Sequence, residues 1–118
     1  LLAVPPAGPV ERRARALVQH RCRVFEAIAP YERAALVKRW DSEFLAERHA
    51  AMTRRLRAEA RRWLPELDAM PGELPQALEL LLSFEAWDRL RSEQRLGPVR
   101  TAAVMERAVT ALLAERSA

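Results

Sequence analysis

Apolar residues recur every three or four positions along most of the chain, which is the spacing of one face of an α-helix. No segment alternates apolar and polar residues in the way that a half-buried strand does. Alanine, leucine, arginine and glutamate dominate the sequence, and all four favour helices. We therefore predict an all-α fold: a five-helix, bundle-like domain over residues 10–118, preceded by a Pro/Gly-rich linker or loop over residues 1–9.

Prolines, glycines and capping residues set the expected helix boundaries, because each of them interrupts or starts a helix for a known steric reason. The signals are, in chain order, Pro30, Asp41 or Ser42, Pro65, Pro71-Gly72 and Gly97-Pro98. The predicted helices span about residues 10–29, 31–40, 42–64, 73–94 and 98–114.

The last predicted helix has an apolar face that is too wide for one neighbour. Its bulky part consists of Met105, Val109 and Leu112. The adjoining part of the same helix has smaller side chains, which are Thr101, Val104, Ala108 and Ala111. The helix expected over residues 73–94 carries a second stripe, which consists of Leu80, Phe84, Trp87 and Arg91. Monomers rarely expose so much apolar surface, so we predict a homodimer in which the last two helices form an intersubunit four-helix bundle. The alternative is that the earlier helices cover both sets.

Polar residues interrupt two of the apolar stripes. Arg21 lies between Leu17 and Phe25, and His49 lies in the stripe of the helix over 42–64. A buried polar group needs a partner, which is either a ligand or another side chain. One interpretation is a ligand pocket, in which Arg21 favours an anionic or carbonyl-bearing molecule. Its predicted residues are Arg21, Phe25, Phe44, His49, Met52, Leu56 and Trp63.

The other interpretation, which the residues taken singly favour, is an ordinary core. Arg21 would then pair with Glu59 or Glu85, and His49 would be hydrogen-bonded inside the protein. The basic run Arg54–Arg62 is likewise open to two interpretations: a solvated helix face, which we prefer, or a stripe that contacts phosphates nonspecifically.

Composition narrows the function further. The net charge is +4, and residues 1–62 carry 14 basic and 7 acidic side chains. The single cysteine, Cys22, cannot form an internal disulfide and fits the cytoplasm, and no apolar run approaches the roughly 18 residues of a membrane span. The sequence has no metal-ligand spacing, no phosphate-binding glycine loop and no local catalytic arrangement. We expect no enzyme activity, no cofactor, no metal and no membrane partner.

Two segments carry a resemblance to a known family. Residues 81–91 read LLSFEAWDRLR and are followed by a short turn and an Ala/Leu-rich helix, while residues 18–31 read VQHRCRVFEAIAPY. In this order and spacing they resemble the ligand-domain helices of TetR/AcrR-type bacterial transcription regulators. The resemblance covers most of residues 10–114. The turn Arg95-Leu96-Gly97-Pro98 departs from the family's Gly-Leu-Ser-Pro-like form.

The resemblance implies an effector-sensing and dimerisation domain, with the last two helices as the dimer helices. It implies a homodimer, an unknown small-molecule effector and a cytoplasmic repressor. Operator DNA would be bound only by an N-terminal helix-turn-helix domain, which is missing from residues 1–118. Two other functions remain open from the residues: a helical protein-interaction module without a ligand, and a nonspecific nucleic-acid binder that uses the Arg54–Arg62 face.

Overall fold

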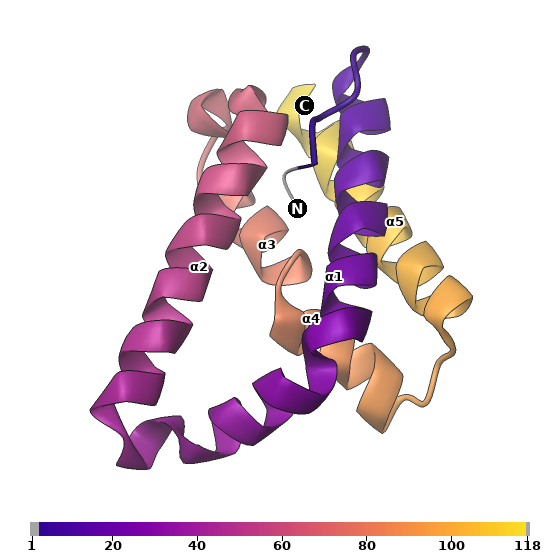
Figure 1. Cartoon of the computed structure of the whole chain (residues 1–118). Coiled ribbons are helices and arrows are strands. Elements are labelled where there is room, and N and C mark those ends of the chain that lie inside the picture. The colour runs from indigo at the N-terminus through magenta and orange to yellow at the C-terminus, as the bar shows by residue number, and fades with distance from the viewer. Residues whose placement is uncertain (1–2, 118) are drawn as a thin grey trace.

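The structure is a computed structural model that describes residues 3–117, and every regular element in this range is helical (Figure 1). The predicted all-α fold is confirmed. Residues 1 and 2 of the expected linker and residue 118 of the expected domain lie outside the described range. The α-helices are α1 (Val10–Lys38), α2 (Glu43–Trp63), α3 (Leu74–Leu81), α4 (Phe84–Asp88) and α5 (Pro98–Ala114). Short 3-10 turns at Arg39–Asp41, Pro65–Ala69 and Glu115–Ser117 and a π-helical turn at Arg89–Glu93 complete the order. None of the described helices combines the length and apolar composition needed to cross a bilayer.

The first two predicted helices form one helix in the structure, because α1 continues through Pro30 to Lys38. A proline inside a helix has no N–H to donate and its ring clashes with the carbonyl four residues earlier, so a helix bends there. Figure 1 shows this bend: the first part of α1 runs down the molecule, and the last turns run across its lower edge toward α2. The expected boundary at Pro30 is therefore wrong as a helix end. It marks a change of direction.

α2 begins and ends where the sequence predicts. Of the two candidate N-caps it is Ser42 whose hydroxyl accepts a hydrogen bond from the backbone N–H of Leu45, at 3.2 Å. This bond satisfies one of the N–H groups left free at a helix start. The helix ends at Trp63, two residues before Pro65.

The single helix expected over 73–94 is broken in the structure at Leu82 and Ser83. The Ser83 hydroxyl donates to the carbonyl of Leu80 at 2.7 Å and accepts from the backbone N–H of Ala86 at 3.1 Å. One side chain thus bonds to the last turn of α3 and caps α4. Serine hydroxyls often compete in this way with the backbone hydrogen bonds of a helix. The break changes which side chains of this segment share a face.

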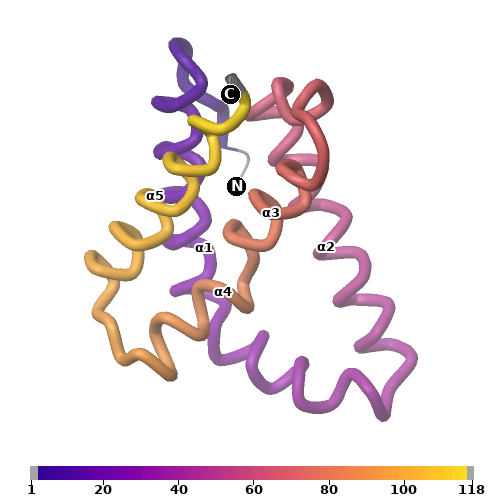
Figure 2. Tube along the Cα trace, turned by 180° about the vertical axis from the view of Figure 1, so that it is seen from behind, coloured from indigo at the N-terminus to yellow at the C-terminus, as the bar shows by residue number. Residues whose placement is uncertain are grey.

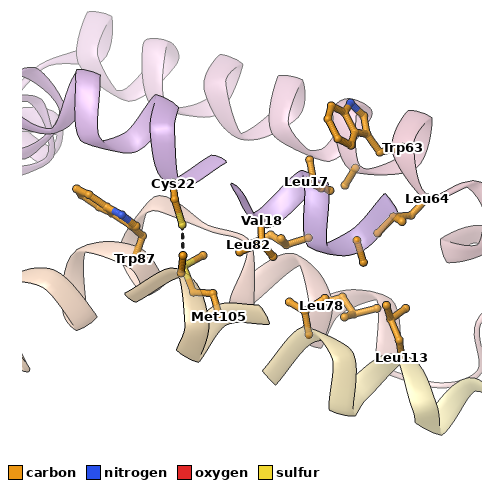
Figure 3. Close-up of a cluster of buried hydrophobic side chains, with 14 of the residues drawn as sticks. Leu17, Val18, Cys22, Trp63, Leu64, Leu78, Leu82, Trp87, Met105 and Leu113 are labelled. Carbon is orange, nitrogen blue, oxygen red and sulfur yellow. Dashed lines mark hydrogen bonds between the residues drawn. The ribbon is translucent and has the colours of Figure 1, made fainter. Parts of the chain in front are cut away.

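α1 forms the centre of the core. It packs most extensively against α5, and the two helices lie side by side in both views (Figures 1 and 2). α3 packs against α5 and completes the core from the other side. Figure 3 shows the meeting of the three helices around Leu17, Val18, Cys22, Leu78, Met105 and Leu113.

α2 is fully buried in this core only at its C-terminal end, and its middle packs against the core through partly buried side chains. The buried residues of α2 are Ala60 and Trp63, whereas Met52 and Leu56 are half-buried and Phe44 is exposed. Figure 1 shows α2 diverging from α1 toward the lower corner, to which the bend at Pro30 leads the chain. The middle of the apolar stripe of α2 is therefore only partly covered.

Candidate ligand groove

A groove of about 710 Å³ lies between α2 and the α3–α4 pair. This volume lies within the range of sites that bind small molecules. α2 supplies one wall, α3 and the start of α4 supply the other, and the buried Arg21 of α1 lies at the base. Four of the seven residues predicted for a ligand pocket line this groove: Arg21, His49, Met52 and Leu56.

The second wall was missed from the sequence. Gln76, Leu80 and Ser83 line it, and they are spaced by four and three positions. They therefore lie on one face of the segment, away from the buried Leu74 and Leu78. The spacing of these three residues could have identified the second wall. However, the predicted helix is apolar nearly all round in this region, so the sequence does not distinguish this face from the buried one. Leu80, one of the residues predicted for the dimer interface, is 66% exposed and lies in the groove wall.

Arg21 holds three segments together. Its Nε donates to Glu59 Oε1 at 3.2 Å, its Nη1 donates to the carbonyl of Leu82 at 3.1 Å, and its Nη2 donates to the carbonyl of Leu56. Burial lowers the pKa of Arg21 because it desolvates the charged form, and the Glu59 carboxylate opposes this effect. Of the two internal pairs considered from the sequence, Arg21–Glu59 is the one that forms. The guanidinium is engaged at every nitrogen, so the argument for an anionic ligand at Arg21 loses its basis.

His49 and Glu85 face each other across the open part of the groove. His49 Nε2 lies 3.9 Å from Glu85 Oε2, which is beyond hydrogen-bond distance. The His49 Nδ1 atom is buried and has no hydrogen-bond partner in the part of the chain that the structure describes. The hydroxyl of Thr53 donates to the backbone carbonyl of His49 at 3.1 Å, so the imidazole itself is not involved in that bond. The histidine that was expected to be hydrogen-bonded internally is therefore incompletely paired.

Two arginines of the basic Arg54–Arg62 run also line the groove, and each has a carboxylate partner. Arg57 Nη2 lies 2.9 Å from Glu79, whose hydrogen bond raises the pKa of Arg57. Arg61 Nε lies 3.0 Å from Asp68. These pairs neutralise part of the basic face, so the expectation of a continuous phosphate-binding stripe gains no support from this geometry.

Three residues predicted for the pocket lie outside it. Phe25 belongs to an aromatic cluster, with its ring centroid 5.5 Å from that of Phe84 and 5.9 Å from that of Trp87. Trp63 is buried in the core at the end of α2, and Phe44 is 75% exposed near the start of α2. The periodicity placed all three on the correct helices, but it did not show where α2 leaves the core.

Several side chains predicted for the dimer interface lie inside the chain. Phe84, Trp87 and Thr101 are buried, and the Thr101 hydroxyl has no hydrogen-bond partner among the described residues. Arg91 is half-buried, and its Nε donates to Glu26 Oε1 at 2.6 Å. For Phe84, Trp87 and Arg91 the break at Ser83 accounts for this outcome, because it removes the continuous stripe that the four-three-four spacing assumed.

The remaining predicted interface residues lie on the outer side of α5. Val104 is 41% exposed, Ala111 is exposed and Ala108 is half-buried. Their spacing of four and three positions puts them on one stripe of the helix. The bulky residues Met105 and Val109 are buried against the rest of the chain, as the two-part face predicted.

Within the described residues, no three His, Cys, Asp or Glu side chains gather in a way that would hold a metal ion. Comparisons of the chain with protein-family models, with curated proteins and with solved structures find no match.

Proposed function

We propose that this chain is the effector-sensing and dimerisation domain of a TetR/AcrR-like transcription regulator, which acts as a repressor through an upstream helix-turn-helix domain. The observation that carries the proposal is the groove beside α2, which has the apolar side chains Met52, Leu56 and Leu80 in its walls and a volume suited to a small molecule. The sequence resemblance supplies the regulatory role. The effector we infer is a small molecule with a largely apolar body.

Arg13 links the end of α2, whose earlier turns line the groove, to the N-terminal segment. Its Nε donates to the carbonyl of Gly8 at 3.0 Å, and its Nη1 donates to the carbonyl of Trp63, at the end of α2, at 3.0 Å. The same guanidinium pairs with Glu66, and the hydrogen bond from Arg13 lowers the pKa of Glu66 to about 2. A displacement of α2 would therefore be transmitted to the residues that precede α1.

In this mechanism the effector acts by preferring one arrangement of α2 over another. Its influence on DNA binding is limited to the difference between its affinities for the two arrangements. A homodimer would hold two upstream domains at the spacing of adjacent half-sites, roughly 34–36 Å along DNA. The small-residue stripe on α5 is our proposed contact between the subunits.

The first test is the mass of the chain in solution, measured by light scattering after gel filtration. We expect a dimer for the wild type and a folded monomer for Val104→Arg, which places a charge on the outer face of α5. Val37→Arg is the matched control, since Val37 is 77% exposed on the distant end of α1. A monomeric wild type at micromolar concentrations would contradict the dimerisation role.

A protein-interaction module is the second candidate function, and one observation favours it. The corner between α1 and α2 exposes four large apolar side chains in a short stretch: Tyr31, Val37, Trp40 and Phe44. Exposed apolar patches of this kind often mark contact surfaces. A dimer that is lost in Val37→Arg and kept in Val104→Arg would move the subunit contact to this corner.

A further inference from the structure

We propose that the groove binds a small organic cation with an apolar body and that the Glu85 carboxylate is its counter-charge. This inference rests on the proposed function, because it names the chemistry of the molecule that the groove would sense.

The arginines of the groove are already matched with carboxylates. The pairs are Arg21–Glu59 at 3.2 Å, Arg57–Glu79 at 2.9 Å and Arg61–Asp68 at 3.0 Å. An incoming anion that bonded to Arg57 or Arg61 would lie close to the carboxylate that each of them already contacts. Like charges at such a separation repel each other, and buried Arg21 cannot leave its partners without exposing unpaired acceptors. The positive side chains of the groove therefore offer little to an anion.

Glu85 is the carboxylate of the groove that has no arginine partner. Its side chain is 52% exposed, and the nearest basic nitrogen within the described part of the chain is His49 Nε2, at 3.9 Å. An ammonium group beside Glu85 can donate a hydrogen bond to the carboxylate. A carboxylate or phosphate at the same place would meet the negative charge of Glu85. The electrostatic complement of this part of the groove is thus a cation.

Part of each groove wall is apolar and accepts a hydrocarbon body. Met52 and Leu56 approach from α2, and Leu80 approaches from α3 with much of its side chain uncovered. Methionine adapts its shape to different apolar partners, which suits a groove rather than a fixed core position. A ligand with its charge at Glu85 and its body along these three side chains would cover apolar surface that the chain alone leaves in water.

The test compares two fluorescent probes with the same apolar body and opposite charge, 1-pyrenemethylamine and 1-pyrenecarboxylate. Each is titrated against the full chain, against Glu85→Gln and against Glu115→Gln, which removes an exposed carboxylate at the end of α5. We expect the wild type to bind the cation about tenfold more tightly than the anion, as one half-exposed, charge-assisted hydrogen bond would give. Glu85→Gln should abolish this preference, and Glu115→Gln should retain it.

Thermal unfolding provides a second readout, because a ligand that binds only the folded chain raises its melting temperature. The cation should raise the melting temperature of the wild type more than that of Glu85→Gln, with circular dichroism confirming that both are folded. Equal affinity for the two probes, preference for the anion, or an unchanged preference in Glu85→Gln would overturn the role of Glu85 and leave the groove as the effector site. Failure of both probes to bind would count against the cation proposal and the groove alike, while the solution mass reports separately on dimerisation.

Discussion

Replacing Arg21 with methionine tests whether this side chain supports the fold or serves a ligand. The substitution retains much of the apolar length and removes the donors to Glu59 and to the carbonyls of Leu56 and Leu82. Breaking a buried ion pair from one side costs about 3–5 kcal/mol, and each buried acceptor left unpaired costs about 1–3 kcal/mol. Glu59 keeps His20 Nε2 at 3.4 Å, which reduces the loss. These costs overlap, because each reports the loss of the same guanidinium, so they are not additive; we expect the free energy of unfolding to fall by about 3 kcal/mol.

Urea unfolding followed by tryptophan fluorescence measures this change, at one protein concentration so that any dimerisation contributes equally. Arg23→Met is the control, because Arg23 is exposed on the same helix and its loss should alter stability by less than about 0.5 kcal/mol. The double variant Arg21→Met with Glu59→Gln should be more stable than the sum of the single effects predicts, since it leaves no unpaired carboxylate. A loss below about 1 kcal/mol in Arg21→Met would refute the supporting role and return Arg21 to the candidate ligand contacts.

Three further results follow from particular contacts. The hydrogen bond from Arg13 lowers the pKa of Glu66 to about 2. The Glu66 carboxylate should therefore stabilise the fold above its ordinary pKa of 4.5, and this contribution should disappear as the pH falls toward 2. If the free energies of unfolding of the wild type and Glu66→Gln still differ near pH 2, this assignment is contradicted. After allowance for the partial exposure of Glu66, the contribution is about 1 kcal/mol. Arg95 has a φ of 57°, so Arg95→Gly should raise the free energy of unfolding by about 0.5–1 kcal/mol, and an unchanged urea midpoint would argue against strain there. Burial raises the pKa of the Cys22 thiol to about 11, so iodoacetamide at about pH 8 should modify it about 100-fold more slowly than an ordinary thiol; rapid alkylation of the folded chain would contradict this burial.

Local signals in the sequence predicted the helical class and several boundaries. Ser42, Pro65 and Gly97-Pro98 act within one turn of chain, through a cap or a missing N–H, and each stands at the expected helix end. The apolar stripe of α1 and the bulky face of α5 were predicted because periodicity reports which side of a helix is buried.

The errors arose where a residue has two possible effects and tertiary contacts decide between them. Pro30 bends a helix instead of ending it, and Ser83 breaks a segment whose apolar content indicated a continuous helix. These two positions determine where α2 lies and which face of α3 is uncovered. Helical periodicity describes each helix separately, so it could not predict the groove or the position of Leu80 in its wall.

The first turns of α2 should unfold locally while the rest of the chain stays folded. With buried residues only near its C-terminal end, α2 has few apolar contacts that would be lost if its first turns unwound. Its amide hydrogens between Leu45 and Met52 should exchange with solvent at a much lower free energy than those of α1 around Val18. A molecule that occupied the groove would then act by ordering this part of α2, and its apparent affinity would include the entropy lost by the helix.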